Sequence, residues 1–427
     1  MSGLISVAEA LARILAGVPG PVAAETVALA RAAGRTLAAD VAALRTQPPF
    51  PASAMDGYAV RGADAAVAGA ALRLVGTSAA GHGFSGAIGP GETVRIFTGA
   101  PVPEGADAVL IQENARAEAG AVVVLEAVVP QRFIRRAGLD FFAGDALLAA
   151  GDTLDARRLA LAAAAGHGRV AVRRKPRVAI LATGDELVQP GETPAWDQII
   201  ASNALALAAL VTSAGAEAID LGIAGDSLPA LEAAFGQARA ARADLLVTLG
   251  GASVGDHDLV QAALAREGLE LGFWRVALRP GKPLMHGHLR IVPHGDPRLA
   301  DSDDASASSM MVIGLPGNPV SSIVCGLLFV VPAVRALLGD PLAGADRSEP
   351  ATLGRDLDAN DGRQDYLRAG LDTAPDRMPV AHPESRQDSS MLAVLGKAEA
   401  LLIRAPHAPA ARAGDPCRII RLDRTLL

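Results

Sequence analysis

The chain has 427 residues, of which 50% are hydrophobic, 20% are charged and only 3% are aromatic. This length predicts several domains, and the composition supplies enough apolar side chains for packed cores. The formal net charge of −7 argues against a general nucleic-acid-binding surface, so an anionic ligand would need a local group of basic side chains. Cys325 and Cys417 are too far apart in sequence for a metal motif and fit a reducing compartment.

The first 45 residues are predicted to be helical. Residues 5–18 carry apolar side chains at helical spacing, and Ser6 with Glu9 forms a capping box at their start. A second helical pattern covers residues 27–38. The N-terminal stretch lacks a basic start and contains Glu9, so we expect no signal peptide.

Residues 46–143 have a different pattern. Short β-type runs alternate with Gly and Pro turns, which predicts a small β-rich domain. Residues 144–175 return to a helical pattern. We therefore expect the β domain to be an insertion into one helical domain formed by residues 1–45 and 144–175.

Three polar positions stand out in the predicted β domain. Asp56 precedes a glycine in a predicted tight turn, although a turn aspartate is more often structural. Thr98 ends a predicted strand. Asp140 follows a basic pair, for which a solvated charged face is the simpler interpretation.

Residues 176–339 alternate apolar strand patterns with helical patterns, which predicts a doubly wound, largely parallel α/β domain. The uncharged stretch 305–334 is broken by Pro and Gly, so we interpret it as a buried strand, a loop and a buried helix rather than a membrane span. Residues 293–309 are polar and are predicted to be a flexible surface insertion. Residues 345–427 are again β-like and predict a small barrel or an open sheet.

Ligands of doubly wound sheets bind beyond the C-terminal ends of the strands, and the loops there are polar. In chain order they supply Asp185 and Glu186, then Asp226, then Gly250, Gly251, Ser253, Asp256 and Asp258, then Arg279 and Lys282, and last Ser321. Carboxylates beside cations, glycine turns and helix N-termini suit a Mg²⁺-bridged phosphate or another oxyanion. Glu186, Asp226 and Asp258 are the predicted Mg²⁺ ligands. The chain has no Walker A sequence, and no GxGxxG follows the first strand of this domain, which excludes the ordinary nucleotide motifs.

Seven loop motifs, in this order, resemble one family. SAMDGYA, FTGAPVP, RRAGLD, TGDEL, GGASVGDHD, RPGKP and LPGNPVS are similar to motifs of the molybdopterin molybdenumtransferases, which include the bacterial MoeA type and the E domain of gephyrin. The resemblance spans about residues 4–425. It implies an elongated helical domain with an inserted β domain, a molybdopterin-binding α/β domain and a C-terminal small β-barrel. It also implies a homodimer whose cleft lies between the α/β domain of one subunit and the inserted domain of the other.

The implied reaction inserts molybdate into adenylylated molybdopterin and releases AMP, with Mg²⁺ present. The resemblance, together with the polar loops at the strand ends, predicts catalytic carboxylates at Asp56, Asp140, Glu186, Asp226 and Asp258. It also predicts substrate or molybdate contacts at Thr98, Asp185, Gly250, Gly251, Ser253, Arg279, Lys282, Pro283, Pro316, Pro319, Ser321 and Arg368. The family usually has Lys where Arg279 stands and Val where Ala252 stands, and the last serine motif offers Ser389 and Ser390 but lacks a later serine.

The resemblance further suggests a cytoplasmic protein that meets the molybdopterin adenylyltransferase and molybdoenzyme chaperones, with no nucleic acid and no membrane as partner. Two other functions compete with the transferase. A molybdopterin adenylyltransferase, or another Mg²⁺-dependent nucleotide-handling enzyme, would use the same α/β core but usually lacks the inserted β domain. A non-enzymatic scaffold is the third, since the E domain of gephyrin also clusters receptors; the retained carboxylates favour an enzyme.

Overall fold

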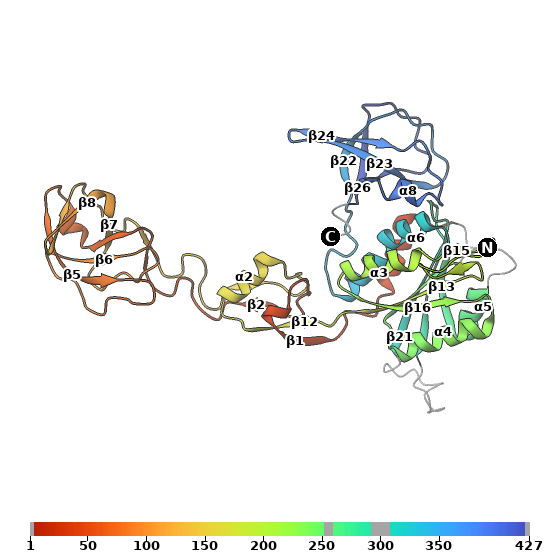
Figure 1. The fold of residues 1–427 in the computed structure, drawn as a ribbon, viewed down its shortest axis with the longest axis horizontal. Coiled ribbons are helices and arrows are strands. Elements are labelled where there is room, and N and C mark those ends of the chain that lie inside the picture. The colour runs from red at the N-terminus through yellow and green to blue at the C-terminus, as the bar shows by residue number, and fades with distance from the viewer. Residues whose placement is uncertain (1–3, 252–258, 292–307, 423–427) are drawn as a thin grey trace.

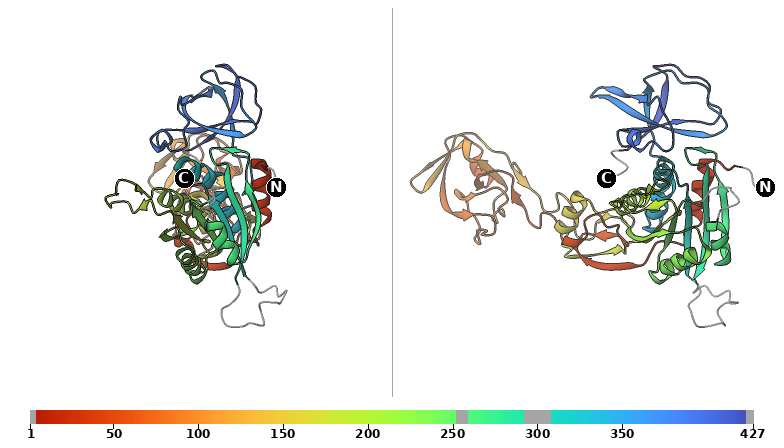
Figure 2. Two further views of the ribbon diagram at one scale, coloured as in Figure 1. Left: turned by 90° about the vertical axis from the view of Figure 1, so that its right-hand side faces the viewer. Right: turned by 45° about the vertical axis from the view of Figure 1, so that its right-hand side comes forward.

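The structure, a computed structural model, describes residues 4–251, 259–291 and 308–422 (Figure 1). Ser253, Asp256, Asp258 and nearly all of the predicted surface insertion lie outside the described residues. The molecule is elongated. A β-rich part lies at one end, a narrow middle region follows, and an α/β part with a β-barrel above it lies at the other end (Figures 1 and 2).

The first predicted helix is confirmed as α1 (Val7–Ala16), and the side chain of Ser6 accepts a hydrogen bond from the backbone N–H of Glu9 at 3.1 Å. The second predicted helix is wrong. The chain forms strand β1 (Ala24–Ala28) and a single 3-10 turn (Leu29–Arg31). β1 takes its backbone hydrogen bonds from β12 (Arg169–Arg173), so tertiary pairing overrides the helix propensity of an alanine-rich segment.

The middle region joins two segments that are far apart in sequence. Besides β1 and β12, strand β2 (Val41–Ala42) pairs with β11 (Ala146–Leu148), and α2 (Ala156–Ala164) lies beside them. Their shared core contains Leu37, Leu154 and Val172, all fully buried. The chain therefore leaves and re-enters this region side by side, as the predicted insertion requires.

The part that lies between these two segments in sequence forms a six-stranded sheet of order β7-β4-β6-β5-β9-β8. Its strands are β4 (Gly57–Val60), β5 (Ala71–Ser78), β6 (Glu92–Ile96), β7 (Ala108–Ile111), β8 (Ala115–Glu118) and β9 (Ala121–Val124). Two short strands, β3 (Ala52–Ser53) and β10 (Ile134–Arg135), pair beside it, and 3-10 turns cover Gly62–Ala65 and Gln112–Asn114. We call this part the inserted sheet. The β3–β10 pairing brings the loop before Asp56 against the loop before Asp140.

The predicted doubly wound sheet is confirmed, with strand order β16-β13-β17-β21-β20-β18. Its strands are β13 (Arg177–Thr183), β16 (Glu217–Ala224), β17 (Leu245–Leu249), β18 (Leu269–Arg275), β20 (Pro283–Ile291) and β21 (Ser308–Leu315). Its helices are α3 (Asn203–Ser213), α4 (Leu228–Ala240), α5 (Leu259–Arg266), α6 (Pro319–Cys325) and α7 (Val331–Leu337), and a small pair is formed by β14 (Leu187–Val188) and β15 (Ile199–Ile200). The four neighbours β16, β13, β17 and β21 are parallel, and β20 is antiparallel to both β21 and β18.

Both faces of this sheet are covered. Along β13, Val178 and Ile180 belong to the apolar core that contains α3, α6, α7 and also α1, whereas Ala179 and Leu181 belong to the core beneath α4 and α5. This alternation explains why the strand is apolar throughout. The helical run 319–337, in which a π turn (Gly326–Val330) joins α6 to α7, is long and apolar enough to span a membrane, but 72% of it is buried inside the protein, as in a core helix.

The C-terminal strands form a closed five-stranded barrel, one of the two predicted alternatives. They are β22 (Glu349–Leu353), β23 (Gln364–Ala374), β24 (Arg377–Pro383), β25 (Ala400–Arg404) and β26 (Pro416–Arg421), with a short helix α8 (Leu392–Leu395) before β25. The ring closes because β23 pairs with both β24 and β25. A two-residue strand of the α/β part, β19 (Leu278–Arg279), extends the barrel by pairing with β23.

Gly57 gives a test of packing in the inserted sheet. A Cβ atom there would overlap the carbonyl group of Leu110 on the neighbouring strand β7. We expect Gly57→Ala to destabilise the inserted sheet by about 2 kcal/mol, the usual cost of forcing extra volume into a packed site, seen as a lower thermal midpoint in calorimetry. Gly168→Ala is the control, because no described heavy atom lies within 4 Å of its added Cβ. Equal midpoints for the two variants would contradict the close approach.

Candidate functional site

The loops after the first two parallel strands are tied to each other. The N–H of Gly184, directly after β13, donates to the carbonyl oxygen of Ala224 at 3.1 Å, and the N–H of Asp226 donates to Oδ1 of Asp185 at 3.0 Å. Asp185 therefore holds the turn at Asp226 in place. The side chains of Glu186 and Asp226 are exposed at the same edge, which leaves their carboxylates accessible to a ligand.

The glycine turn after β17 lies against two neighbouring turns. The N–H of Gly250 donates to the carbonyl oxygen of Leu315 at 3.1 Å, and Gly317 lies next to Gly250. Gly250 has a φ of +104°, and a Cβ there would be 2.7 Å from the carbonyl oxygen of Thr183, so only glycine fits. The predicted residues Gly250 and Gly251 thus lie at the sheet edge formed by the C-terminal ends of the parallel strands.

Hydrogen bonds from side chains on α3 and α6 hold the turn at residues 316–319. Nδ2 of Asn203, at the start of α3, donates to the carbonyl oxygen of Gly317 at 2.7 Å. The hydroxyl of Ser322 donates to the carbonyl oxygens of Asn318, at 3.2 Å, and Pro316. Pro316, Pro319 and the buried Ser321 are therefore fixed at the start of α6. Sequence reasoning missed Asn203, because nothing in its own loop indicates a partner 114 residues away.

The barrel contributes to the same edge. Nδ2 of Asn318 donates to Oγ of Ser389 at 3.0 Å, and the N–H of Val320 donates to the carbonyl oxygen of Ser389 at 3.0 Å. Arg368 on β23 is 1% exposed, and its Nη2 donates to the carbonyl oxygen of Asp388 at 2.9 Å. The buried Nε of Arg368 has no hydrogen-bond partner among the residues that the structure describes. A buried donor of this kind calls for a ligand or water.

Burial lowers the pKa of the Arg368 guanidinium, while the nearby Asp388 carboxylate opposes this shift. An arginine remains protonated under these conditions. The edge therefore contains a fixed buried cation with one N–H to offer. This is the donor type expected for a tetrahedral oxyanion.

The loop at residues 279–283 gives a result that the sequence did not predict. Arg279 was expected to contact an anion directly. In the structure its Nε donates to Asp365 at 2.8 Å, its Nη2 also donates to Asp365 and, at 3.1 Å, to Asn360, and its Nη1 donates to Asp361 at 3.3 Å. Lys282 is exposed. Pro283 begins β20.

A polar cavity of about 390 Å³ lies where this loop meets the barrel. Its lining includes Arg279 and Arg368, which the sequence singled out, and also Arg355 and Arg404, which it did not. The latter two come from separate barrel strands or loops, so no local sequence pattern indicates them. The lining also contains the carboxylates of Asp358, Asp365 and Glu384, so the cavity is a mixed-charge surface with a small excess of arginines.

The predicted residues of the inserted sheet form a second group. Oδ1 of Asp56 accepts hydrogen bonds from the backbone N–H and the hydroxyl of Thr98, each at 2.7 Å. These two bonds, led by the backbone one, hold the pKa of Asp56 below its usual 3.8, and the positive charge of Arg95 adds to the shift. Asp140 is exposed, and its N–H donates to the carbonyl oxygen of Gln47 at 3.0 Å. The inserted sheet lies at the opposite end of the molecule from the α/β part (Figures 1 and 2), so the structure keeps the two groups of predicted residues apart in one copy.

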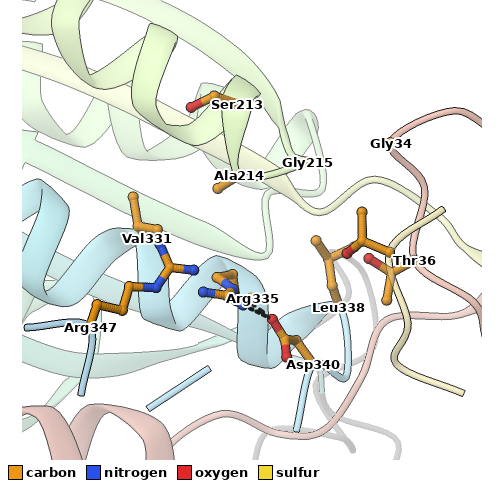
Figure 3. A pocket seen from close by; sticks show the side chains of 11 residues that line it. Gly34, Thr36, Ser213, Ala214, Gly215, Val331, Arg335, Leu338, Asp340 and Arg347 are labelled. Atoms are coloured by element: carbon orange, nitrogen blue, oxygen red, sulfur yellow. Dashed lines mark hydrogen bonds and ion pairs between the residues drawn. The ribbon is translucent and has the colours of Figure 1, made fainter. Parts of the chain in front are cut away.

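A second cavity, of about 200 Å³, lies between the middle region and the α/β part (Figure 3). Thr36 lines one side of it, and Arg335 with Asp340 lines the other. Nε of Arg335 donates to Asp340 at 2.6 Å. None of the predicted site residues lines this cavity, which marks it as a structural junction.

Three family models match the chain in succession. They are the MoeA N-terminal region (domain I and II) over residues 5–166, the probable molybdopterin binding domain over 179–336, and the MoeA C-terminal region (domain IV) over 350–422. The chain is 39% identical to a molybdopterin molybdenumtransferase of Nostoc sp. over 74% of this chain and 70% of the relative. It is 36% identical to one of Haemophilus influenzae over 79% and 78%. A crystal structure of a molybdopterin biosynthesis MoeA protein from Pyrococcus horikoshii is similar with a TM-score of 0.79, at 27% identity, over 98% of this chain and 99% of that one.

The pairing of Asp56 with Thr98 can be tested by titration. Thr98→Val keeps the backbone N–H but removes the hydroxyl, so we expect the pKa of Asp56 to rise toward 3.8, measured by carboxyl NMR. Because the folded-state pKa is depressed, ionised Asp56 favours the folded state above pH 3.8, and this contribution disappears as the pH falls through the lower folded-state value. Asp155, whose pKa is lowered by Arg158 and Arg157, is the internal control. An unchanged Asp56 titration would refute the hydroxyl contact.

Proposed function

Since this chain belongs to the molybdopterin molybdenumtransferase family, we propose that it inserts molybdate into adenylylated molybdopterin, releasing AMP and giving the molybdenum cofactor. It is a transferase of molybdenum cofactor biosynthesis. The single observation that carries the proposal is the attachment of the barrel to the turn at residues 316–319, which places a buried arginine with an unsatisfied N–H beside a domain whose strand ends carry exposed carboxylates. Such an arrangement can hold a charged nucleotide and an oxyanion together.

The competing adenylyltransferase is not favoured. The probable molybdopterin binding domain covers residues 179–336, but the match to the MoeA family continues on both sides of it, over residues 5–166 and 350–422. The C-terminal match includes Arg368 and the barrel loop that contacts the turn at residues 316–319. An enzyme that used the α/β domain alone would not need these contacts.

Molybdate is proposed to bind between the barrel and the loops at the edge. Arg368 offers its free Nε–H, Lys282 adds an exposed positive charge, and Ser321 adds a hydroxyl at the start of α6. Pro283, Pro316 and Pro319 stiffen the surrounding turns, and the turn at Gly250 and Gly251 lets the pterin approach the backbone closely. A fixed cation beside backbone and hydroxyl donors is a suitable cradle for a tetrahedral oxyanion.

Mg²⁺ belongs to the proposal. Among the described residues, no three His, Cys, Asp or Glu side chains form a metal cage. Mg²⁺ commonly uses only one or two carboxylates, keeps several waters and takes its other ligands from substrate phosphates, so exposed Glu186 and Asp226 fit such a role. Asp258, the third predicted ligand, lies outside the described residues. When bound, Mg²⁺ would neutralise negative charge on the pyrophosphate.

The inserted sheet is proposed to complete the site. Thr98 keeps Asp56 ionised, which suits a carboxylate that holds a cation or orients a water molecule rather than one that donates a proton. Asp140 lies on the neighbouring loop, because β3 pairs with β10. These groups would act with Glu186 and Asp226 on the same substrate.

We propose a homodimer, because residues of the inserted sheet and of the α/β edge would act on the same substrate. The inserted sheet and the α/β edge lie at opposite ends of one chain (Figure 1), so we propose that each active cleft combines the α/β edge of one copy with the inserted sheet of the other. We place the protein in the cytoplasm, where its two unpaired cysteines fit a reducing environment. The adenylylating enzyme would supply its substrate, and molybdoenzyme chaperones would take its product.

The reaction gives the main functional test. Purified protein incubated with adenylylated molybdopterin, Mg²⁺ and molybdate is expected to release AMP, measured by chromatography. Asp226→Asn should slow this release by on the order of 100-fold, because a group in direct contact with the reacting phosphates loses its charge. Asp376→Asn, at the exposed tip of the β23–β24 hairpin, should have no effect. Equal rates for the wild type and Asp226→Asn would refute the assignment of the edge.

The shared cleft predicts complementation between inactive copies. Asp56→Ala and Asp226→Ala should each be inactive alone. A mixed dimer of the two variants contains one cleft in which both aspartates are intact, so mixing after partial unfolding should restore activity. Light scattering should give twice the chain mass of 43.3 kDa. A monomer mass, or no recovery on mixing, would argue that each chain works alone.

A further inference from the structure

The ion pair between Arg279 and Asp365 links the α/β loop to the barrel in an unusual way. The guanidinium uses Nε and Nη2 together on the Asp365 carboxylate, and it also reaches Asn360 and Asp361. The Asp365 side chain is only 4% exposed, whereas that of Arg279 is 45% exposed. The buried partner is therefore the carboxylate, and Arg279 is the cation that binds it through two nitrogens.

We propose that Arg279 and Asp365 are positioning residues for the transferase reaction: their pairing fixes the start of β23 on the α/β domain and thereby places Arg368 at the oxyanion site. In this role Arg279 acts through the barrel and does not touch the oxyanion. This proposal rests on the function proposed above for the same edge.

The backbone supports this role. β19 and β23 run parallel, with Leu278 opposite Gln364 and Arg279 opposite Asp365, and the N–H of Gln364 donates to the carbonyl oxygen of Ala277 at 2.9 Å. Arg368 follows Asp365 by three residues on the same strand, a separation of roughly 10 Å in an extended chain. A shift of β23 at Asp365 is therefore transmitted directly to Arg368.

The other side of Arg368 is anchored separately. Its backbone N–H donates to Oε1 of Gln387 at 2.9 Å, and Nε2 of Gln387 donates back to the carbonyl oxygen of Arg368 at 3.0 Å. Ser389, two residues after Gln387, accepts a hydrogen bond from Asn318 in the turn of the α/β domain. Arg368 therefore lies between two attachments of the barrel, one made by Arg279 and the other by Asn318.

The side-chain chemistry explains why arginine suits this position. A planar guanidinium can bind one carboxylate through two nitrogens while its remaining N–H groups reach further acceptors, which an ammonium group cannot do with the same geometry. The observed contacts use all three nitrogens of Arg279. They occupy four of its five N–H groups, so a direct contact to an oxyanion could use only one Nη1 N–H unless part of this set were broken.

A positioning role for Arg279 and a direct contact of Arg279 with molybdate predict different results in a double-mutant cycle. If Arg279 acts by positioning, Arg279→Gln and Asp365→Asn should each raise the KM for molybdate by on the order of 10-fold to 100-fold, the effect of a small misplacement in an active site. The double variant should be no worse than the worse single variant. The KM for adenylylated molybdopterin should stay unchanged. Arg279→Lys should raise the KM for molybdate less than Arg279→Gln does, since lysine keeps the positive charge but cannot bind Asp365 through two nitrogens.

Other outcomes would overturn the proposal. If Arg279 contacts molybdate directly, Asp365→Asn would leave the KM for molybdate unchanged or lower it, because the guanidinium would be released toward the anion. If the increases in the KM for molybdate of the two single variants multiplied in the double variant, Arg279 and Asp365 would not act as a pair. Arg418→Gln is the matched control: Arg418 is a barrel arginine paired with Asp346, and its loss should not alter the KM.

A measurement without substrate separates this inference from the function. Hydrogen exchange of residues 364–368 and 387–390 should be faster in Arg279→Gln and in Asp365→Asn than in the wild type, with the α/β sheet unchanged. Unaltered exchange in both segments would refute the positioning role. If the wild type released no AMP, the proposed function would fail while this measurement still decided whether Arg279 positions the barrel. Arg279→Lys serves if either neutral variant does not fold.

Discussion

β16, β13, β17 and β21 run parallel, and this arrangement determines where the loops of the α/β part meet. Parallel strands end at one edge, so the loops after them must meet there, whatever their distance in sequence. Each loop then stabilises its neighbour, as Asp185 does for the turn at Asp226 and as the N–H of Gly250 does by donating to the carbonyl oxygen of Leu315. Carboxylates that would repel one another in a flexible chain are thus held together by backbone hydrogen bonds, ready for a ligand that carries positive charge.

The barrel adds the opposite charge to this edge. Its strand β23 brings Arg368, and the loop at residues 387–390 attaches to the turn that opens α6 through Ser389. The burial of Arg368 leaves its Nε without a partner in the described part of the chain, a cost that a bound oxyanion would remove. The site is therefore a junction of two domains. In the proposed site the position of Arg368 depends on how the barrel is attached to the α/β part, and the Arg279–Asp365 pair is one of these attachments.

Much of the fold could be predicted from sequence, because its signals are local. The apolar run 245–249 indicates a buried strand, and the convergence of the loops follows from topology alone. The second N-terminal helix failed because Ala and Leu at helical spacing carry no information about a strand partner, β12, far along the chain. The ion pairs of Arg279 were missed for the same reason, since its partners lie 82 and 86 residues away. Gly57 was expected in a turn, but the close approach of Leu110 is what excludes a side chain there.

The middle region supplies the last step of the argument for a shared cleft. Two separate pairings, β1 with β12 and β2 with β11, join the outgoing and returning segments, and the core around Leu37 and Val172 fills the space between them. These pairings hold the middle region extended, and in one copy the inserted sheet lies at the far end of the molecule from the α/β part (Figure 1). In the proposed homodimer, the inserted sheet of a second copy would lie at the α/β edge instead. The ionised Asp56 would then face carboxylates of another chain, so the assembled cleft would gain most from a cation bound between them.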